Sequence, residues 1–316
     1  MDFKKLHNLI IEMELPAYRE KQIRQAFCRD LAENWNEVTV LPKDLREKLA
    51  DQIKWNSVKE DKVIENKKDG SAKAALRLAD GSLIETVLIR HNDNRNTVCV
   101  SSQVGCPMGC AFCATGRVGF RRNLEPEEIA EQVLFFARML KKQDPLFISP
   151  FVRGRKNRSG EKNLLPLLEK ERGGVRSDKV TNVVFMGMGE PFLNYDNVMK
   201  AVKVLNDKEG FNLGARHISI STCGIVPGIR KLTKERLQIN LAFSLHASDN
   251  ELRDRLMPVN KKYPIEEILA AVDFYIKKTN RRVMVEYALI DGVNDGEAEA
   301  KNLADLIKPR PLCYVN

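Results

Sequence analysis

The spacing of apolar residues changes twice along the chain. From residue 3 to about residue 54, apolar side chains recur every three or four positions, as at Leu6, Leu9 and Ile10. This period predicts short helices, and many of their polar positions are Lys or Arg. Cys28 lies beside the apolar side of one helix, where we expect it in the core. The basic helices are either an RNA-contacting accessory domain or an ordinary solvated surface.

Residues 62–89 follow a strand pattern instead. The segments Ala74–Leu78 and Leu83–Ile89 flank the turn pair Asp80-Gly81, which predicts a β-hairpin ahead of the main domain. Glu85 lies in the second strand, where by itself it is an exposed strand carboxylate.

From about Thr97 onward, strand and helix patterns alternate. Strands are expected at Val98–Ser102, Val183–Met188, His217–Thr222, Leu241–His246, Val283–Ile290 and Cys313–Asn316. Helices are expected at Pro126–Lys141, Tyr195–Lys208, Val226–Glu235, Ile265–Lys278 and Gly296–Ile307. The alternation predicts an α/β fold whose parallel sheet has right-handed crossovers and binds ligands at the carboxyl ends of its strands.

The length of 316 residues and mass of 36.0 kDa fit about two domains. We expect a helical accessory domain at residues 1–60, a hairpin and linker at 61–96, and the α/β core at 97–316. Within the core, residues 142–179 are basic and glycine-containing without a regular period. That segment is either a surface insertion or an RNA-contacting arm.

Charge and cysteine usage narrow the class of protein. The formal net charge of +9 favours a polyanionic partner such as RNA, although many basic proteins bind nothing acidic. The chain shows neither a secretory signal nor an apolar run long enough to cross a membrane, and its seven cysteines are an odd number. We therefore expect a cytoplasmic protein, without membrane contact and monomeric, whose crowded cysteines serve a metal site.

Three of the cysteines lie within eight residues, as Cys106, Cys110 and Cys113. Thiolates hold iron–sulfur clusters, and three thiolates leave one iron of a cubic cluster open to bind another molecule. A structural zinc site or a chance grouping is the alternative, although no second cysteine pair lies nearby in the sequence.

Further candidate groups follow the predicted strands. Gly187-Met188-Gly189-Glu190-Pro191 combines a flexible backbone with a carboxylate that could accept from an ammonium group. Ser221-Thr222-Cys223-Gly224 and Ser244-Leu245-His246 end the next two strands. Taken alone, these hydroxyls and this imidazole are as consistent with capping or core hydrogen bonds as with ligand binding.

Together these motifs resemble a known family. The cysteine spacing is similar to that of radical S-adenosylmethionine (SAM) enzymes, and the run from Cys99 to Gly116 followed by Arg122-Asn123-Leu124 resembles the RlmN/Cfr family of RNA adenine methyltransferases. The resemblance extends from about Asp80 to Asn316. It implies a partial (β/α) radical SAM barrel, and methylation of C2 of an adenine in 23S rRNA, with tRNA as a second possible substrate. A Cfr-like enzyme would methylate C8 instead.

The resemblance also implies roles for individual residues. Cys106, Cys110 and Cys113 would bind a 4Fe-4S cluster reduced by a flavodoxin-like donor. Contacts to SAM would come from seven positions: Gly189, Glu190, Ser221, Ser244, Leu245, His246 and Asn316. Glu85 in Ile84–Val87 matches the proton acceptor, and Cys99 matches the region of a thiol that resolves a protein–RNA intermediate.

The implied reaction uses two SAM molecules. One methylates a cysteine, and the second yields a 5′-deoxyadenosyl radical that takes a hydrogen from that methyl group before the carbon adds to an unstacked adenine. In the family this cysteine lies beyond a Val-Asn pair, here Val315-Asn316. We therefore expect it to be absent from this chain, the barrel to be cut short in its sixth strand, and the chain to bind cluster and SAM without completing methyl transfer.

Two rivals of other kinds stay open at this point. One is a radical SAM enzyme with a different substrate, and the other is a non-catalytic RNA-binding remnant that holds zinc or no metal.

Overall fold

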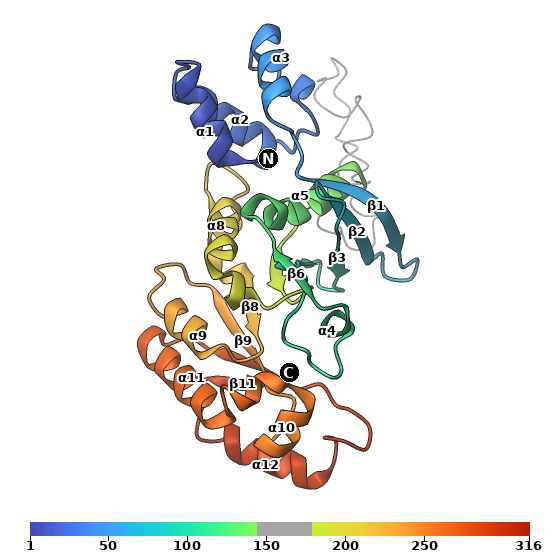
Figure 1. Ribbon diagram of the computed structural model, residues 1–316, viewed down its shortest axis with the longest axis vertical. Helices are drawn as coiled ribbons and strands as arrows, with labels where there is room; N and C mark the ends of the chain where they lie inside the picture. Colours follow the sequence, from blue (N-terminus) through green and yellow to red (C-terminus); the bar gives the residue numbers. More distant parts are fainter. Residues whose placement is uncertain (144–178) are drawn as a thin grey trace, which may run out of the picture.

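The computed structural model describes residues 1–143 and 179–316, and its central feature is a nine-stranded mixed sheet (Figure 1). Along the sheet the strands follow the order β1-β2-β3-β4-β7-β8-β9-β10-β11. Their bounds are β1 Val58–Glu65, β2 Ala72–Leu78, β3 Leu83–Arg90, β4 Asn96–Cys99, β7 Asn182–Phe185, β8 Ile218–Thr222, β9 Asn240–Ser244, β10 Val283–Glu286 and β11 Cys313–Val315. A separate pair, β5 Gln103–Gly105 and β6 Phe120–Asn123, is antiparallel.

The sheet has two parts that differ in strand direction. Strands β1 to β4 pair antiparallel, whereas β4, β7, β8, β9, β10 and β11 pair parallel in sequence order. The expected hairpin is present as β2 and β3, and it is joined by β1 on one side and by β4 on the other. The antiparallel strands therefore continue the parallel sheet.

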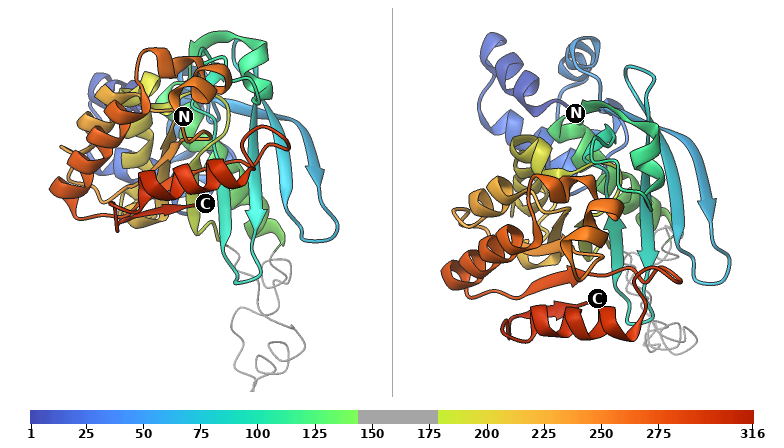
Figure 2. Two further views of the ribbon diagram at one scale, coloured as in Figure 1. Left: turned by 90° about the horizontal axis from the view of Figure 1, so that it is seen from below. Right: turned by 60° about the horizontal axis from the view of Figure 1, so that its bottom comes forward.

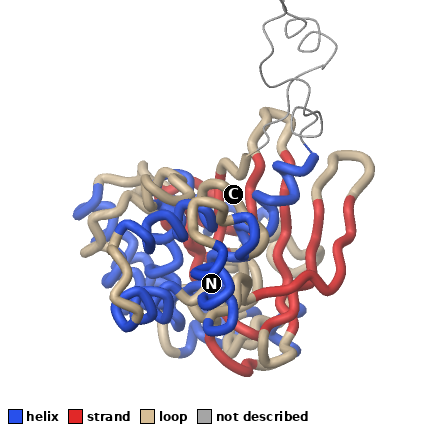
Figure 3. Tube along the Cα trace, turned by 90° about the horizontal axis from the view of Figure 1, so that it is seen from above, coloured by secondary structure: helices blue, strands red, loops and turns tan. Residues whose placement is uncertain are grey.

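Helices cover the outer side of the parallel strands, as the orange and red helices in Figure 2 show. Helix α5 packs against α8, and α11 packs against α9. Viewed as in Figure 3, most helices lie to one side of the strands. The bounds of these elements are α4 Ala114–Val118, α5 Pro126–Gln143, η2 Pro191–Asn194, α8 Tyr195–Asn206, η3 Ala215–His217, α9 Val226–Leu232, α10 Asn250–Leu256, η4 Pro258–Lys261, α11 Ile265–Thr279 and α12 Glu297–Ile307.

The N-terminal helices form a hydrophobic cluster of their own. They are α1 Phe3–Glu12, α2 Tyr18–Cys28, the short η1 Trp35–Glu37 and α3 Lys43–Gln52. Phe27, Trp35 and Trp55 stack edge to face inside the cluster, which reaches the core through Leu134 of α5. Cys28 is buried there, as expected.

Five of the six strands expected from Thr97 onward end one to four residues earlier than the sequence indicates. In two of them, β4 and β10, local hydrogen bonds redirect the chain. The β4 ladder stops at Cys99, and the amides of Ser102 and Gln103 donate to the carbonyl of Met188. Strand β10 stops at Glu286, and the Ala288 amide donates to the His246 ring.

The sequence patterns missed β1 and α10, and the expected insertion at 142–179 lies almost wholly outside the described residues. In the described part of the chain, the helices are too short or too polar to span a lipid bilayer.

Candidate active site

The three clustered cysteines lie in a loop between β5 and β6 that backbone hydrogen bonds hold in place. The Cys106 amide donates to the Gly119 carbonyl at 3.1 Å, and the Cys113 amide donates to the Cys110 carbonyl at 3.1 Å. Gly105 has φ +76°, and a Cβ there would lie 1.7 Å from the Gly119 oxygen. Only glycine fits this crossing of the two loop ends.

The three thiols are half-buried and form no disulfide. Burial, with the neighbouring cysteines adding repulsion, raises the pKa of Cys110 to about 11, and burial also raises the pKa of Cys106. A positively charged group must therefore bind to keep these sulfurs ionised at neutral pH.

Three free thiols in one short loop are the donor set that a 4Fe-4S cluster with one open iron requires. Across residues 1–143 and 179–316, no three His, Cys, Asp or Glu side chains surround one metal position. In a cubic cluster each thiolate binds its own iron, so the sulfurs lie farther apart than around one zinc ion. The residues present thus fit the cluster.

The loop after β7 is packed tightly against the segment that leads into the cysteines. Gly189 has φ +103°, and a Cβ there would lie 2.6 Å from the Gln103 Cβ. The Glu190 amide donates to the Gln103 side-chain oxygen at 2.8 Å. Gly189 was expected to let a ligand approach the backbone closely. In the structure, its missing side chain also lets the Gln103 segment approach.

Glu190 is 3% exposed and joins two strand ends. One carboxylate oxygen accepts from the Phe192 amide at 3.0 Å and the other from the Cys223 amide at 2.7 Å. Burial raises the pKa of Glu190. The side chains of Cys223 and Thr222 also hydrogen-bond to this carboxylate.

The ends of β8 and β9 bring Ser221, Ser244, Leu245 and His246 to one rim. The Leu245 side chain is fully buried, so any ligand contact there falls to its backbone. The His246 ring packs edge to face on the ring of Phe112 in the cysteine loop, with 4.7 Å between the ring centroids. This contact joins the rim to the loop.

His246 has a defined tautomer. Its Nδ1 accepts from the Ala288 amide at 3.0 Å, so the neutral ring carries its proton on Nε2. Burial, to which the charge of Arg253 adds, lowers the pKa of His246 to about 4. The imidazole is therefore neutral at physiological pH.

Strand register places the remaining candidates on one face of the sheet. Partners across neighbouring strands share a face, and alternate residues along a strand do too. The face contains Glu85, Val87, Cys99, Val184, Ser219, Ser221, Ala242, Ser244 and Glu286. Its residues are mostly small or polar, as expected for an inner face that is open to a ligand.

Asn316 reaches this face from the last strand. Its side-chain amide donates to Glu286 at 2.9 Å, and Glu286 pairs in register with Ser244. Glu85 is 52% exposed and forms an ion pair with Lys73 at 2.7 Å. The structure thus brings the expected site residues to one face and one rim.

Three polar residues that hold this rim were missed from the sequence. Gln103 binds the Glu190 amide, as described above. Asn294 donates to the carbonyls of His246 at 2.9 Å and Ala288 at 2.8 Å. Arg253 is fully buried beneath the rim. No sequence motif marks these three residues, because each one binds backbone groups that are distant in the sequence and come close only in the folded chain.

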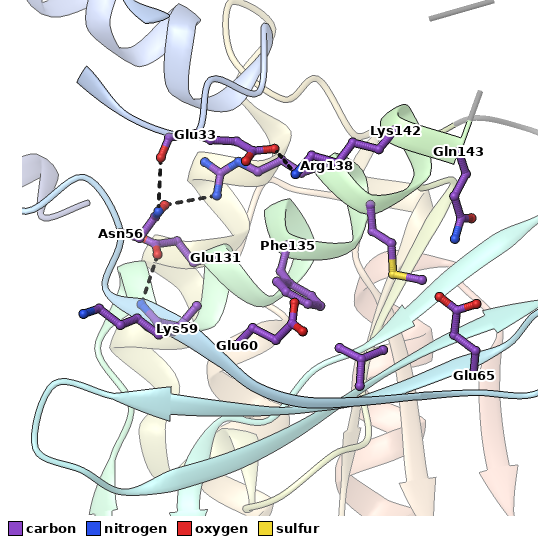
Figure 4. A pocket seen from close by; sticks show the side chains of 13 residues that line it. Glu33, Asn56, Lys59, Glu60, Glu65, Glu131, Phe135, Arg138, Lys142 and Gln143 are labelled. Atoms are coloured by element: carbon purple, nitrogen blue, oxygen red, sulfur yellow. Dashed lines mark hydrogen bonds and ion pairs between the residues drawn. The ribbon is translucent and has the colours of Figure 1, made fainter. Parts of the chain in front are cut away.

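A cavity of about 610 Å³ lies elsewhere, between β1, α5 and the N-terminal helices (Figure 4). Some of its charged side chains pair with neighbours, as Glu33 does with Lys142 and Arg138 does with Asn56. The cavity contains none of the site candidates, so we do not place the reaction there.

Comparisons with known proteins agree with this geometry. Residues 157–304 match the model of the radical SAM superfamily. A "Probable dual-specificity RNA methyltransferase RlmN" from Dictyoglomus turgidum is 42% identical over 316 residues, which is 100% of this chain and 80% of the relative. A "Ribosomal RNA large subunit methyltransferase N" from Nitrosopumilus maritimus is 40% identical over 96% of this chain and 80% of its own length.

A solved structure shares the architecture. The crystal structure of a radical SAM methyltransferase from Sphaerobacter thermophilus has a TM-score of 0.83 and 41% sequence identity, covering 100% of this chain and 82% of that one. Identity at this level over all of this chain and 80–82% of its relatives shows descent from one family, and the cysteine loop and strand-end rim lie within the aligned region. The chain belongs to the RlmN family of radical SAM RNA methyltransferases.

Proposed function

We propose that this chain acts as a SAM-dependent RNA methyltransferase that directs a methyl group to C2 of an adenine in 23S rRNA, with tRNA as a second substrate. One observation carries the proposal: the three-cysteine loop lies against the rim formed by the ends of β7, β8 and β9. The ring contact between Phe112 and His246 joins the two directly, and the hydrogen bond from the Ala111 amide to the Leu256 carbonyl at 2.9 Å holds the loop on the neighbouring helix α10. The names of the relatives favour C2 over the Cfr-like C8 reaction.

Cys106, Cys110 and Cys113 would hold the 4Fe-4S cluster. When bound and reduced, the cluster supplies the electron that cleaves SAM to a 5′-deoxyadenosyl radical. The loop's own contribution is to hold three thiolates at fixed positions beside the rim, because its ends are tied by the Cys106 to Gly119 hydrogen bond.

The rim would hold SAM. The backbone at Gly189 and the carboxylate of Glu190 offer acceptors for its ammonium group. Ser221 and Ser244 supply hydroxyls, and the Nε2–H of neutral His246 is a donor. Asn316 lies across the same face through Glu286.

Glu85 and Cys99 would act on the RNA base. They share the inner face, and Glu85 is exposed enough to reach a proton on a base that has left its stack. Burial raises the pKa of Cys99 to about 11, so it is a protonated thiol at neutral pH. Cys99 would serve as the thiol that helps to resolve the protein–RNA intermediate.

The wider setting follows from the substrate class. A flavodoxin-like protein would reduce the 4Fe-4S cluster. The basic N-terminal helices would contact RNA, and the reaction would take place in the cytoplasm, where rRNA is found. We expect the protein to act as a monomer.

The decisive experiment is anaerobic reconstitution with iron and sulfide, followed by incubation with SAM and dithionite. We expect about four irons per chain, as a 4Fe-4S cluster requires, and formation of 5′-deoxyadenosine. SAM cleavage needs only the cluster, SAM and a reductant, so it tests the site independently of later methyl transfer. Zinc in place of iron, or intact SAM under reductant, would overturn the proposal.

The substrate is tested separately with an rRNA fragment. Binding of the fragment is expected with or without SAM cleavage, whereas a radical SAM enzyme of another substrate class would cleave SAM and ignore RNA. If methylated nucleosides form, mass spectrometry against 2-methyladenosine and 8-methyladenosine standards separates the two positions.

A further inference from the structure

A single arginine beneath the rim is bound to four oxygen atoms. Arg253 of α10 donates from Nε to the Leu245 carbonyl at 3.1 Å and from Nη1 to the Asn260 side-chain oxygen at 2.8 Å. Its Nη2 donates to the carbonyls of Cys223 at 2.8 Å and Ser244 at 2.9 Å. The side chain is fully buried.

A buried cation needs a reason, because removing a charge from water is costly unless hydrogen bonds compensate. Burial lowers the pKa of Arg253 to about 10, so the guanidinium is still charged at neutral pH. Within the described residues no carboxylate forms an ion pair with it, and its acceptors are three carbonyls and one amide. The charge is therefore balanced by the oriented carbonyl dipoles of the strand ends, together with the charge of Asp254 beyond Asn260.

Those carbonyls belong to two adjacent strand ends. The Cys223 carbonyl follows β8, and the Ser244 and Leu245 carbonyls end β9. A planar guanidinium with five N–H groups fixes the spacing of such acceptors, which a single ammonium group cannot do. Arg253 thus sets how far apart the two strand ends lie.

The guanidinium is itself held in place. Asn260 accepts from it and donates to the side chains of Asn250 at 3.1 Å and Asp254 at 2.8 Å. The helix α10 also ends at Leu256, whose carbonyl binds the Ala111 amide of the cysteine loop. One short helix therefore contacts both the rim and the cysteine loop.

We propose that Arg253 is a positioning residue for SAM: it holds the ends of β8 and β9 at the spacing at which Ser221, Ser244 and His246 bind one SAM molecule. The proposal rests on the proposed function, since it concerns the same rim. It assigns to Arg253 no contact with SAM.

The test compares Arg253→Lys with Leu252→Ala. Lys keeps the charge but cannot bridge the carbonyls of two strands. Leu252 is the adjacent residue on α10, is 5% exposed, packs in the core, and as an apolar side chain can donate no hydrogen bond to the rim carbonyls. It therefore controls for loss of stability in the same helix.

SAM dissociation constants are measured on reconstituted protein by isothermal titration, with iron content and circular dichroism as checks of folding. We expect Arg253→Lys to raise the dissociation constant about tenfold or more, the loss of roughly one to two hydrogen bonds. Leu252→Ala should stay within about twofold of the wild type, since it alters packing alone.

Wild-type affinity in Arg253→Lys, or an equal loss in Leu252→Ala, would overturn the proposal. If Arg253→Lys does not fold, Asn260→Ala decides, because it removes only the side chain that orients the guanidinium. Its dissociation constant should rise several-fold, and an unchanged value would refute positioning. If the proposed function itself is wrong, the wild-type protein will not bind SAM. This result differs from a failure of the positioning proposal, in which the wild type binds SAM and the variants bind it equally well.

Discussion

His246 shows how one residue combines conformation, burial and charge. It adopts φ +55°, a left-handed conformation that Asn also tolerates, and its Nδ1 accepts a backbone hydrogen bond. Because the residue is only 7% exposed, protonating its imidazole in the folded state is unfavourable.

This burial predicts a dependence of stability on pH. The pKa of His246 is about 4 when folded, whereas an unfolded histidine has a pKa near 6.5. Between these values only the unfolded chain binds the proton, so stability falls as pH falls from about 6.5 towards 4. Between pH 7 and pH 5 the wild type should lose about 2 kcal/mol more than His246→Asn. Urea unfolding of both proteins at the two pH values measures this difference, and equal losses would contradict it.

The cysteines provide a second prediction at this scale. Replacing Cys106, Cys110 or Cys113 by Ser should abolish iron binding and 5′-deoxyadenosine formation, because three thiolates are the minimum that leaves one iron open. Cys313→Ala is the control, since Cys313 is also buried but lies in β11 outside the loop. Iron analysis after anaerobic reconstitution decides, and a Ser variant that keeps full iron would exclude that residue as a ligand.

Among the elements, the loop after β7 depends most on its glycines. Both Gly189 and Gly292 have a positive φ, of +103° and +67°. A Cβ added at Gly189 would collide with Gln103, whereas a Cβ added at Gly292 would meet no atom within 4 Å. The pair separates backbone strain from crowding.

Gly292→Ala should cost about 1 kcal/mol through backbone strain alone. Gly189→Ala should cost about 2 kcal/mol more, because Gln103 must move, and it should weaken SAM binding. Thermal unfolding and SAM titration test both variants together. Equal costs at the two positions would show that the Gln103 segment yields without strain.

The sequence predicted those elements whose apolar spacing is strong, such as α5, α8 and α11. It missed β1 because that strand is mostly exposed and has no alternation to detect. It missed α10 because seven residues with two apolar anchors show too little period.

The same limit applies to the candidate site. Contiguous motifs located the cysteine loop, the Gly189-Glu190 turn and the rim at Ser244 to His246. Arg253 and Asn294 could not be found, because their partners are backbone carbonyls brought near by the fold. The register that places Glu85 and Cys99 on one face also needed the structure.

For the molecule as a whole, the net charge of +9 should govern how RNA binds. Affinity for an rRNA fragment should fall at least about tenfold between 50 and 200 mM KCl, as counterions compete with phosphate contacts. Filter binding across this range gives the slope. An affinity that does not change with salt would show that base contacts, and not charge, dominate.

The antiparallel end of the sheet has one further consequence. Strand β1 is the outermost strand there, its exposed positions carry Lys59, Glu60, Asp61 and Lys62, and its pairing with β2 shifts register between Glu60 and Lys62. An incoming strand from another molecule would have to bury these charges and match a distorted backbone. This border should therefore resist fibril-like growth, even though its outward amides and carbonyls pair with no other strand among residues 1–143 and 179–316.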